Sequence, residues 1–129
     1  MSLTSGRSCL RADAGYCGIA AVCTMAFAKP LGSAFGMPAV LLLGVALVTA
    51  LWAGLLLFAA TGSRLRLSLA GVMGANVIAA SLIAALGLTR PADALSLLLL
   101  AVAVEVGAFA AWQAFLLSRG PSGKAGGSR

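Results

Sequence analysis

Glu105 is the residue of this sequence with the clearest capacity for chemistry, because it lies almost midway along the apolar stretch 92–117. In hydrocarbon a carboxyl group is costly unless it is paired, hydrogen-bonded or protonated, and such acids often mark proton or ion pathways. The same residue can instead be a neutral acid that joins two helices through a hydrogen bond. The structural role is the favoured one, and a proton or cation site is the alternative.

Asn76 is the leading candidate for a hydrogen-bond partner of Glu105. It lies near the middle of the preceding apolar stretch, at a similar depth, so neighbouring antiparallel helices can bring the two side chains together. Ser81, Thr49 and Gln113 are the other polar candidates. Glu105 and Asn76 therefore form the predicted intramembrane polar site, in which Asn76 is expected to hold helices together.

The sequence offers no set of residues for catalysis, metal binding or cofactor binding. It has no histidine, which excludes Ser–His and Cys–His nucleophile pairs, and its three acids give no convincing carboxylate pair. Cys9, Cys17 and Cys23 lack the CxxC spacing of a zinc site. We interpret them as small apolar fillers with one exposed thiol, at Cys9. An enzyme is therefore not expected.

The elements that must position these residues are too apolar for a water-soluble domain. Hydrophobic residues make up 61% of the 129 residues and charged residues 9%, whereas soluble domains average about a quarter charged residues. The net charge of +6 comes from short basic clusters between apolar runs, a distribution typical of membrane topology signals and not of a nucleic-acid site. The expected partner is the lipid bilayer, with other membrane proteins or a second copy of the chain as further candidates.

The apolar stretches predict a single membrane domain over residues 12–117 and an all-α fold: a four-helix transmembrane bundle, up-down-up-down, with short loops. A polar cytoplasmic tail is expected over 1–11, a connection over 31–37, and a disordered basic tail over 118–129. The four predicted spans are 12–28, 39–60, 67–88 and 92–117.

The first apolar stretch has a second interpretation. Its basic start, its apolar core and the sequence Ala26-Phe27-Ala28 also fit a secretory signal that is cleaved. Asp13 is the single charge inside the stretch and lies near its predicted start. Whether the first span is retained or removed is open at this point.

The basic residues predict how the chain is oriented. With four spans, seven of the nine fall on the side of both termini, and Lys29 and Arg90 fall on the other. Cytoplasmic loops accumulate Lys and Arg, so both termini are expected in the cytoplasm and the chain in the cell (inner) membrane.

Small residues at four-residue spacing predict where the helices approach one another, because they allow close backbone contact in lipid. The three stripes are Ala46, Ala50 and Gly54; Gly71, Ala75 and Ala79; and Ala103, Gly107 and Ala111.

A series of short motifs resembles one family. Arg11-Ala12-Asp13 opens the first span, Lys29-Pro30-Leu31-Gly32 closes it, and Phe35-Gly36-Met37-Pro38 opens the second. Ala75-Asn76 and the end of the fourth span, from Ala111-Trp112-Gln113 through Leu117-Ser118-Arg119, also fit. Over residues 10–119 the chain is similar to the uncharacterised small four-helix integral membrane proteins common in high-GC actinobacteria. The resemblance implies that the first span is retained, and the family has no established activity to carry over.

The leading hypothesis from the sequence is a non-enzymatic, multi-pass membrane protein that acts as a subunit or modulator of a membrane complex. The alternative is a small proton-coupled transporter that uses Glu105. A lipid or quinone site between helices is a third, weaker possibility.

Overall fold

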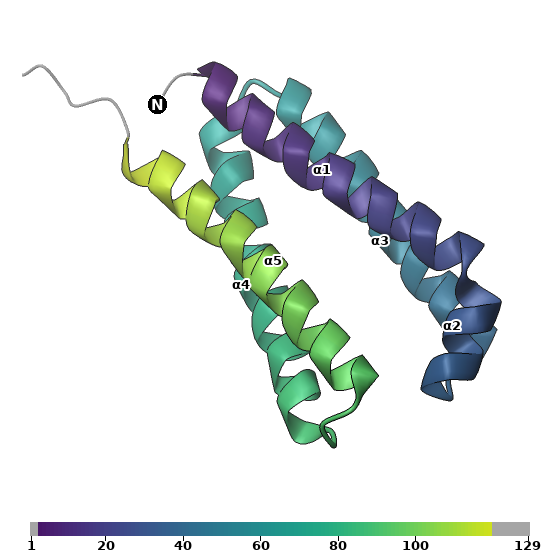
Figure 1. Ribbon diagram of the computed structural model, residues 1–129. Helices are drawn as coiled ribbons and strands as arrows, with labels where there is room; N and C mark the ends of the chain where they lie inside the picture. The colour runs from purple at the N-terminus through teal and green to yellow at the C-terminus, as the bar shows by residue number, and fades with distance from the viewer. Residues whose placement is uncertain (1–2, 120–129) are drawn as a thin grey trace, which may run out of the picture.

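The computed structural model describes residues 3–119, and the regular secondary structure of this part of the chain is all helical (Figure 1). Residues 1–2 and 120–129 lie outside the described part, and so does most of the tail predicted over 118–129. Ser118 instead ends the last helix. The five helices are α1 (Leu3–Ala26), α2 (Ala28–Phe35), α3 (Ala39–Thr61), α4 (Leu65–Thr89) and α5 (Ala94–Ser118).

The helices form two antiparallel hairpins that diverge from one another. Helix α1 packs along α3, and α4 packs along α5, whereas the two hairpins touch each other much less. They are close together where α1 begins and α5 ends, which we name the closed end, and far apart at the opposite, open end (Figure 1). The all-α class is confirmed. Two splayed hairpins and a fifth, short helix replace the single four-helix bundle that the sequence predicted.

Helices α3, α4 and α5 are each long and apolar enough to cross a membrane. Helices α1 and α2 pass the same test only together, and the chain bends by 78° between them. The protein is therefore a helical membrane protein, and its residues 3–119 contain three such helices, or four spans if the bent pair is counted as one.

Helix α1 begins at Leu3, so residues 3–11, which the sequence assigned to a polar tail, are helical and continuous with the first predicted span. Gly6, Cys9, Leu10, Asp13 and Ala14 are buried, and their three- and four-residue spacing places them on one face of the helix. Cys9 is 0% exposed, which contradicts the exposed thiol expected there. The core at the closed end comprises Cys9, Leu10, Ala14, Leu56, Ala60, Leu65, Leu69, Val72 and Leu116.

The connection predicted over residues 31–37 is mostly helix α2. It ends at Gly36, whose φ of 63° is left-handed and so favours glycine. The backbone amides of Gly36 and Met37 both donate to the carbonyl oxygen of Gly32. A Cβ atom on Gly32 would lie 2.6 Å from the carbonyl oxygen of Met37, so this tight turn into α3 excludes a larger residue at Gly32.

Helices α4 and α5 are connected at the open end of the molecule, where the first turn of α5 is capped. The Oδ1 atom of Asp93 accepts a hydrogen bond of 2.7 Å from the backbone amide of Ser96. The Ser96 hydroxyl donates to the Gly87 carbonyl oxygen at 2.8 Å. A Cβ atom on Gly87 would lie 3.1 Å from Cγ of Leu100, which shows how closely α4 and α5 approach here.

Small residues line the seams of the hairpins at seven-residue spacing. In α3, Ala46, Ala53 and Ala60 are buried, whereas Ala50 and Gly54 of the predicted four-residue stripe are exposed. Seven residues make almost two helical turns, so this spacing keeps one face toward an antiparallel neighbour. The four-residue stripe predicted in α3 is therefore wrong beyond Ala46. Helices α1 and α5 repeat the seven-residue spacing at Ala14 and Ala21, and at Ser96, Ala103 and Ala110.

Candidate functional site

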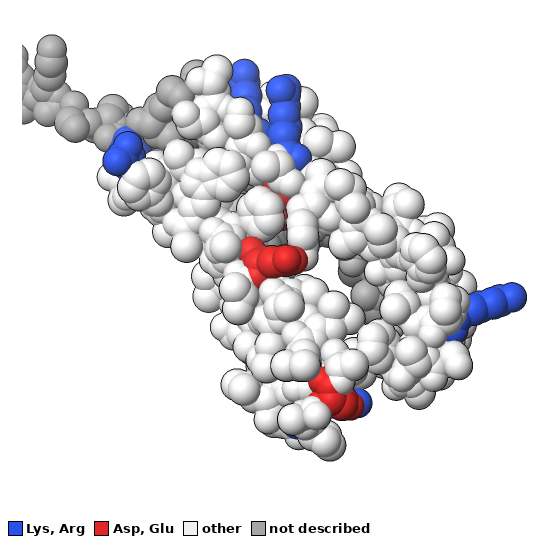
Figure 2. Space-filling model, viewed as in Figure 1, with Lys and Arg blue, Asp and Glu red and all other residues white. Residues whose placement is uncertain are grey.

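A cavity of about 480 Å³ lies between the hairpins. Its wall is mainly Ala and Val side chains with Trp52, and α1, α3 and α4 add the polar ones, namely Asp13, Tyr16, Cys17, Thr24, Thr49 and Asn76. Figure 2 shows the molecule hollowed between the hairpins, with acidic side chains near the hollow. The fold therefore gathers scarce polar residues around one space between the hairpins.

Asp13 is the centre of a hydrogen-bonded cluster that joins three helices. The side chain is only 2% exposed, and its Oδ2 atom accepts hydrogen bonds from Asn76 Nδ2 at 2.9 Å and from Gln113 Nε2 at 3.0 Å. The Asn76 amide also donates to Gln113 Oε1 at 3.3 Å, so both of its N–H groups are used. Cys17 Sγ lies 3.7 Å from Asp13 Oδ1. We name Asp13, Cys17, Asn76 and Gln113 the aspartate cluster.

The aspartate cluster contains no basic residue. Within residues 3–119 the structure shows no ion pair to Asp13; the recorded ion pair joins Arg90 to Asp93, 3.5 Å apart in the connection between α4 and α5. Two amide donors offset part of the cost of burying a carboxyl group, and a proton or a bound cation can offset the remainder. The Asp13 carboxyl group is therefore held by neutral donors alone within the described residues.

Glu105 makes a second polar contact between the hairpins. Its Oε2 atom accepts a hydrogen bond from the hydroxyl of Tyr16, which lies three residues after Asp13 on the same side of α1. Tyr16 lines the cavity, while Glu105 itself is exposed. The Tyr16 ring also packs against Phe109, with 5.7 Å between the ring centroids. Tyr16 thus connects the exposed acid to the cavity wall.

The predicted contact between Glu105 and Asn76 is not formed. Asn76 binds Asp13, and Glu105 binds Tyr16. The other polar candidates also have different partners. The hydroxyls of Ser81 and Thr49 donate to carbonyl oxygens of their own helices, and Gln113, which is 0% exposed, belongs to the aspartate cluster.

Sequence reasoning missed Asp13, Tyr16 and Cys17 as site residues. With a helix start at residue 12, Asp13 falls at the membrane surface, where an acid needs no partner. Because α1 begins at Leu3, the same residue lies near the middle of the helix. The signal that was available is the spacing of the three residues, which lie on one helical face at i, i+3 and i+4.

Comparison with known proteins adds no relative. No protein-family model matches the chain, and neither a curated protein nor a solved structure matches it. The resemblance to the actinobacterial membrane proteins therefore stays a prediction. Among residues 3–119, no group of three or more His, Cys, Asp or Glu side chains is arranged to hold a metal ion.

Proposed function

We propose that the protein is a small, non-enzymatic, proton-coupled carrier that binds a lipophilic organic cation between its two hairpins. The observation on which this rests is the cavity of about 480 Å³ whose wall includes Asp13 and Tyr16, the latter bonded to Glu105. Ionisable residues inside membrane segments typically face a cavity and mark the path of a substrate or ion.

The chemistry of the wall selects the class of ligand. Valines of α3 and α5 provide apolar contact, and the rings of Tyr16 and Trp52 can attract a cation to their faces. The carboxyl groups of Asp13 and Glu105 disfavour an anion, and their present partners are all neutral donors, so a purely apolar molecule would not use the attraction that they offer to a cation. A cavity of this size falls within the range of about 300–1,000 Å³ that is usual for small-molecule sites.

Proton coupling follows from competition for the same carboxyl groups. A bound cation stabilises the ionised form of a nearby acid, and a bound proton removes the charge that attracts the cation. Binding of the cation must therefore release protons, and a high proton concentration must weaken binding by the same coupling free energy. Glu105, which is exposed beside the hollow, is the acid through which the proton exchanges.

The carrier is tested with tetraphenylphosphonium as the probe cation and the purified protein in detergent. We expect calorimetric titration to give tighter binding as the pH rises, with protons released into a weakly buffered solution. Glu105→Gln keeps an acceptor for the Tyr16 hydroxyl but removes titration, so proton release should be lost and affinity should fall about tenfold, the effect of losing one charge-assisted contact.

Asp93→Asn is the matched control, because Asp93 is an acid outside the cavity and its replacement should leave binding and proton release unchanged. The carrier proposal fails if Glu105→Gln and Asp13→Asn both bind the probe with the affinity and proton release of the wild type.

The hypothesis of a subunit or modulator of a larger complex, which the sequence favoured, stays a prediction. Its test is affinity purification from membranes in a mild detergent, where a stoichiometric protein partner would support it. The cavity favours the carrier hypothesis because its polar side chains face a space within a single chain and not a surface for another protein.

We further propose that α1 and α2 together complete four spans, with both termini in the cytoplasm of an inner membrane. The exposed basic residues of the described chain support this orientation. The start of α1, the connection between α3 and α4, and the end of α5 carry Arg7, Arg11, Arg64, Arg66 and Arg119. Figure 2 shows basic side chains gathered at this end of the molecule.

The orientation is tested with a membrane-impermeant maleimide on intact cells. In a Cys23→Ala background, Ala92→Cys should react in intact cells, and Ser63→Cys should react only after permeabilisation. The reverse pattern would invert the topology. Cys9 cannot serve as the reporter, because it is buried.

A further inference from the structure

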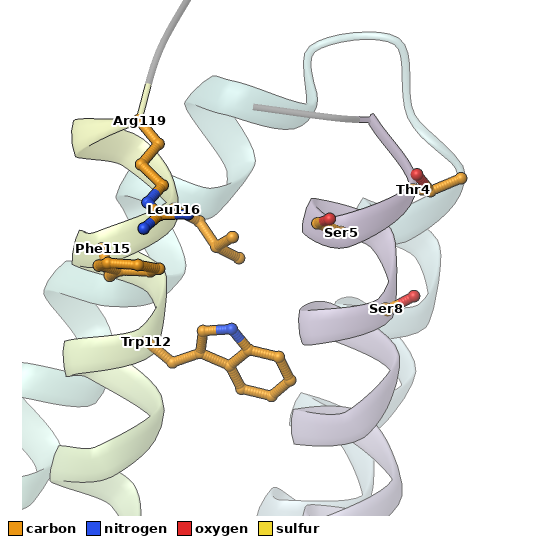
Figure 3. A pocket seen from close by; sticks show the side chains of 7 residues that line it. All are labelled: Thr4, Ser5, Ser8, Trp112, Phe115, Leu116 and Arg119. Carbon is orange, nitrogen blue, oxygen red and sulfur yellow. The ribbon is translucent and has the colours of Figure 1, made fainter.

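A second cavity, of about 700 Å³, opens at the closed end between the start of α1 and the end of α5. Figure 3 shows Thr4, Ser5 and Ser8 along α1 on one wall, opposite side chains of α5 on the other. The α5 wall consists of Trp112, Phe115, Leu116 and Arg119. We name this space the terminal groove. None of its seven lining residues is acidic.

The polar part of the terminal groove has the chemistry of a phosphate site. Arg119 supplies a permanent positive charge, and its guanidinium carbon lies 4.1 Å from the centroid of the Phe115 ring, which holds the group at the wall. The three hydroxyls on α1 can donate hydrogen bonds to phosphate oxygens. Thr4 and Ser5 also lie in the first turn of α1, where backbone amides and the helix dipole favour an anion.

The apolar part of the terminal groove indicates that the phosphate belongs to a lipid. Helix α5 ends at Ser118, which places Arg119 at headgroup level when the helix crosses a membrane. Trp112, Phe115 and Leu116 continue the same wall toward the membrane interior. Trp112 and Phe115 are 42% and 50% exposed, so they offer a surface for an acyl chain directly below the charge.

We infer that the terminal groove binds an anionic phospholipid, with the lipid phosphate between Arg119 and the hydroxyls of α1 and an acyl chain against Trp112 and Phe115. The basic side chains at the closed end attract anionic lipid to the same membrane surface. This site lies apart from the cavity around Asp13, so it does not rest on the carrier proposal.

Fluorescence quenching by brominated lipid tests the site. The chain has two tryptophans, and Trp52→Phe leaves Trp112 as the single reporter. In phosphatidylcholine vesicles that contain an equal mole fraction of either brominated lipid, we expect brominated phosphatidylglycerol to bind beside Trp112 about fivefold more strongly than brominated phosphatidylcholine, the preference that one local basic group provides.

Two variants separate a built site from general surface charge. Arg119→Gln should remove most of the preference, whereas Arg64→Gln, at the same end but outside the groove, should keep most of it. Quenching by brominated phosphatidylcholine must stay unchanged in Arg119→Gln, which shows that α5 is still folded and in lipid. A preference that survives Arg119→Gln, or that falls equally in Arg64→Gln, overturns the inference.

Inorganic phosphate distinguishes the two sources of the anion. If it leaves the quenching by brominated phosphatidylglycerol unchanged, the lipid assignment is supported. If it abolishes that quenching at constant ionic strength, the groove is a site for free phosphate and the lipid assignment fails.

Discussion

Two amide groups donate to the same oxygen of Asp13, and within residues 3–119 no basic side chain forms an ion pair with that residue. The side chains of Asn76 and Gln113 are 5% and 0% exposed, so solvent cannot replace Asp13 as their hydrogen-bond acceptor. Their amides therefore depend on the carboxyl group as much as it depends on them. This mutual dependence ties α1 to the α4–α5 hairpin and predicts a specific pattern of stability.

Asp13→Ala should destabilise the fold through the amides that it leaves behind. A buried polar group that loses its partner costs roughly 1–3 kcal/mol, and two such groups lose their acceptor here. Asp13→Asn keeps one acceptor oxygen and should cost less. The free energy of unfolding, measured by titrating sodium dodecyl sulfate into mixed micelles, checks the order of the two variants. Equal losses would show that the hydrogen bonds contribute nothing, and Cys23→Ala, at an exposed position, serves as the control.

For single residues, the sequence identified polar side chains of the site but did not identify their hydrogen-bond partners. Glu105 and Asn76 stand out because polar side chains inside apolar stretches are rare. Their partners depend on the splay of the hairpins and on the offset between α1 and α5, and no pattern within one helix carries that information. Asp13 was undervalued because a helix boundary was misplaced by nine residues, from 12 to 3.

The limits of the individual helices show which sequence features predict helix ends in so apolar a chain. The predicted limits of 39–60 agree closely with α3 (Ala39–Thr61), and α4 and α5 likewise end near their predicted limits. Apolar runs bounded by proline or arginine mark these ends clearly. In α1 and α2 the corresponding residues, Arg11 and Pro30, lie inside the helices and do not mark their ends. Helix α1 buries its small side chains against α3, and α2 forms after a 78° bend, so tertiary packing decides both.

Gly32→Ala tests the turn between α2 and α3. The new Cβ would meet the backbone oxygen of Met37 at 2.6 Å, and backbone cannot give way as a flexible side chain does. We expect a loss of about 1–3 kcal/mol in the free energy of unfolding, as for other overpacked sites. Gly44→Ala is the matched control: its Cβ meets nothing within 4 Å, and alanine favours a helix by up to about 1 kcal/mol. Similar effects of the two changes would contradict the turn geometry.

Asp93 gives the start of α5 a defined dependence on pH. The backbone amide of Ser96, and then Arg90, hold the pKa of the Asp93 carboxyl below its usual range. A lowered folded-state pKa means that the stabilisation is fully present above the unfolded value of about 4. It is lost as the pH falls through the lowered folded value. Asp93→Asn keeps the cap without titrating, so its stability should not change with pH over that window. A wild type that is equally insensitive to pH there would refute the cap.

The whole molecule consists of two hairpins that share a core only at the closed end. The core of Cys9, Leu56, Leu69 and their neighbours joins all four long helices there, whereas the hairpins separate toward α2 (Figure 1). The sequence predicted the helices but not this separation. Alanine-rich helix faces pack well in several registers. Whether the contact follows small residues at four-residue or at seven-residue spacing depends on the crossing angle of the helices, which composition does not specify.

Ligand binding should narrow the open end. In a cysteine-free background, spin labels at Ser33→Cys in α2 and Leu88→Cys in α4 report the distance between the hairpins. Tetraphenylphosphonium in the cavity should shorten this distance, because the ligand contacts both walls. A second pair, Thr61→Cys and Ser118→Cys, lies at the closed end and should stay unchanged. If the distance between the labels at Ser33 and Leu88 is the same with and without the cation, the hairpins are rigidly held.

The connection over residues 62–64 is the one covalent link between the two hairpins. Helices of 23 and 25 residues extend from it, and at 1.5 Å per residue they reach about 35 Å. A rotation of about 10° at this fulcrum therefore displaces the far ends by roughly 6 Å. Asp13 is bonded to Asn76, which lies almost midway along α4 (Leu65–Thr89), so a small shift of this contact becomes a larger displacement at the far ends of the helices.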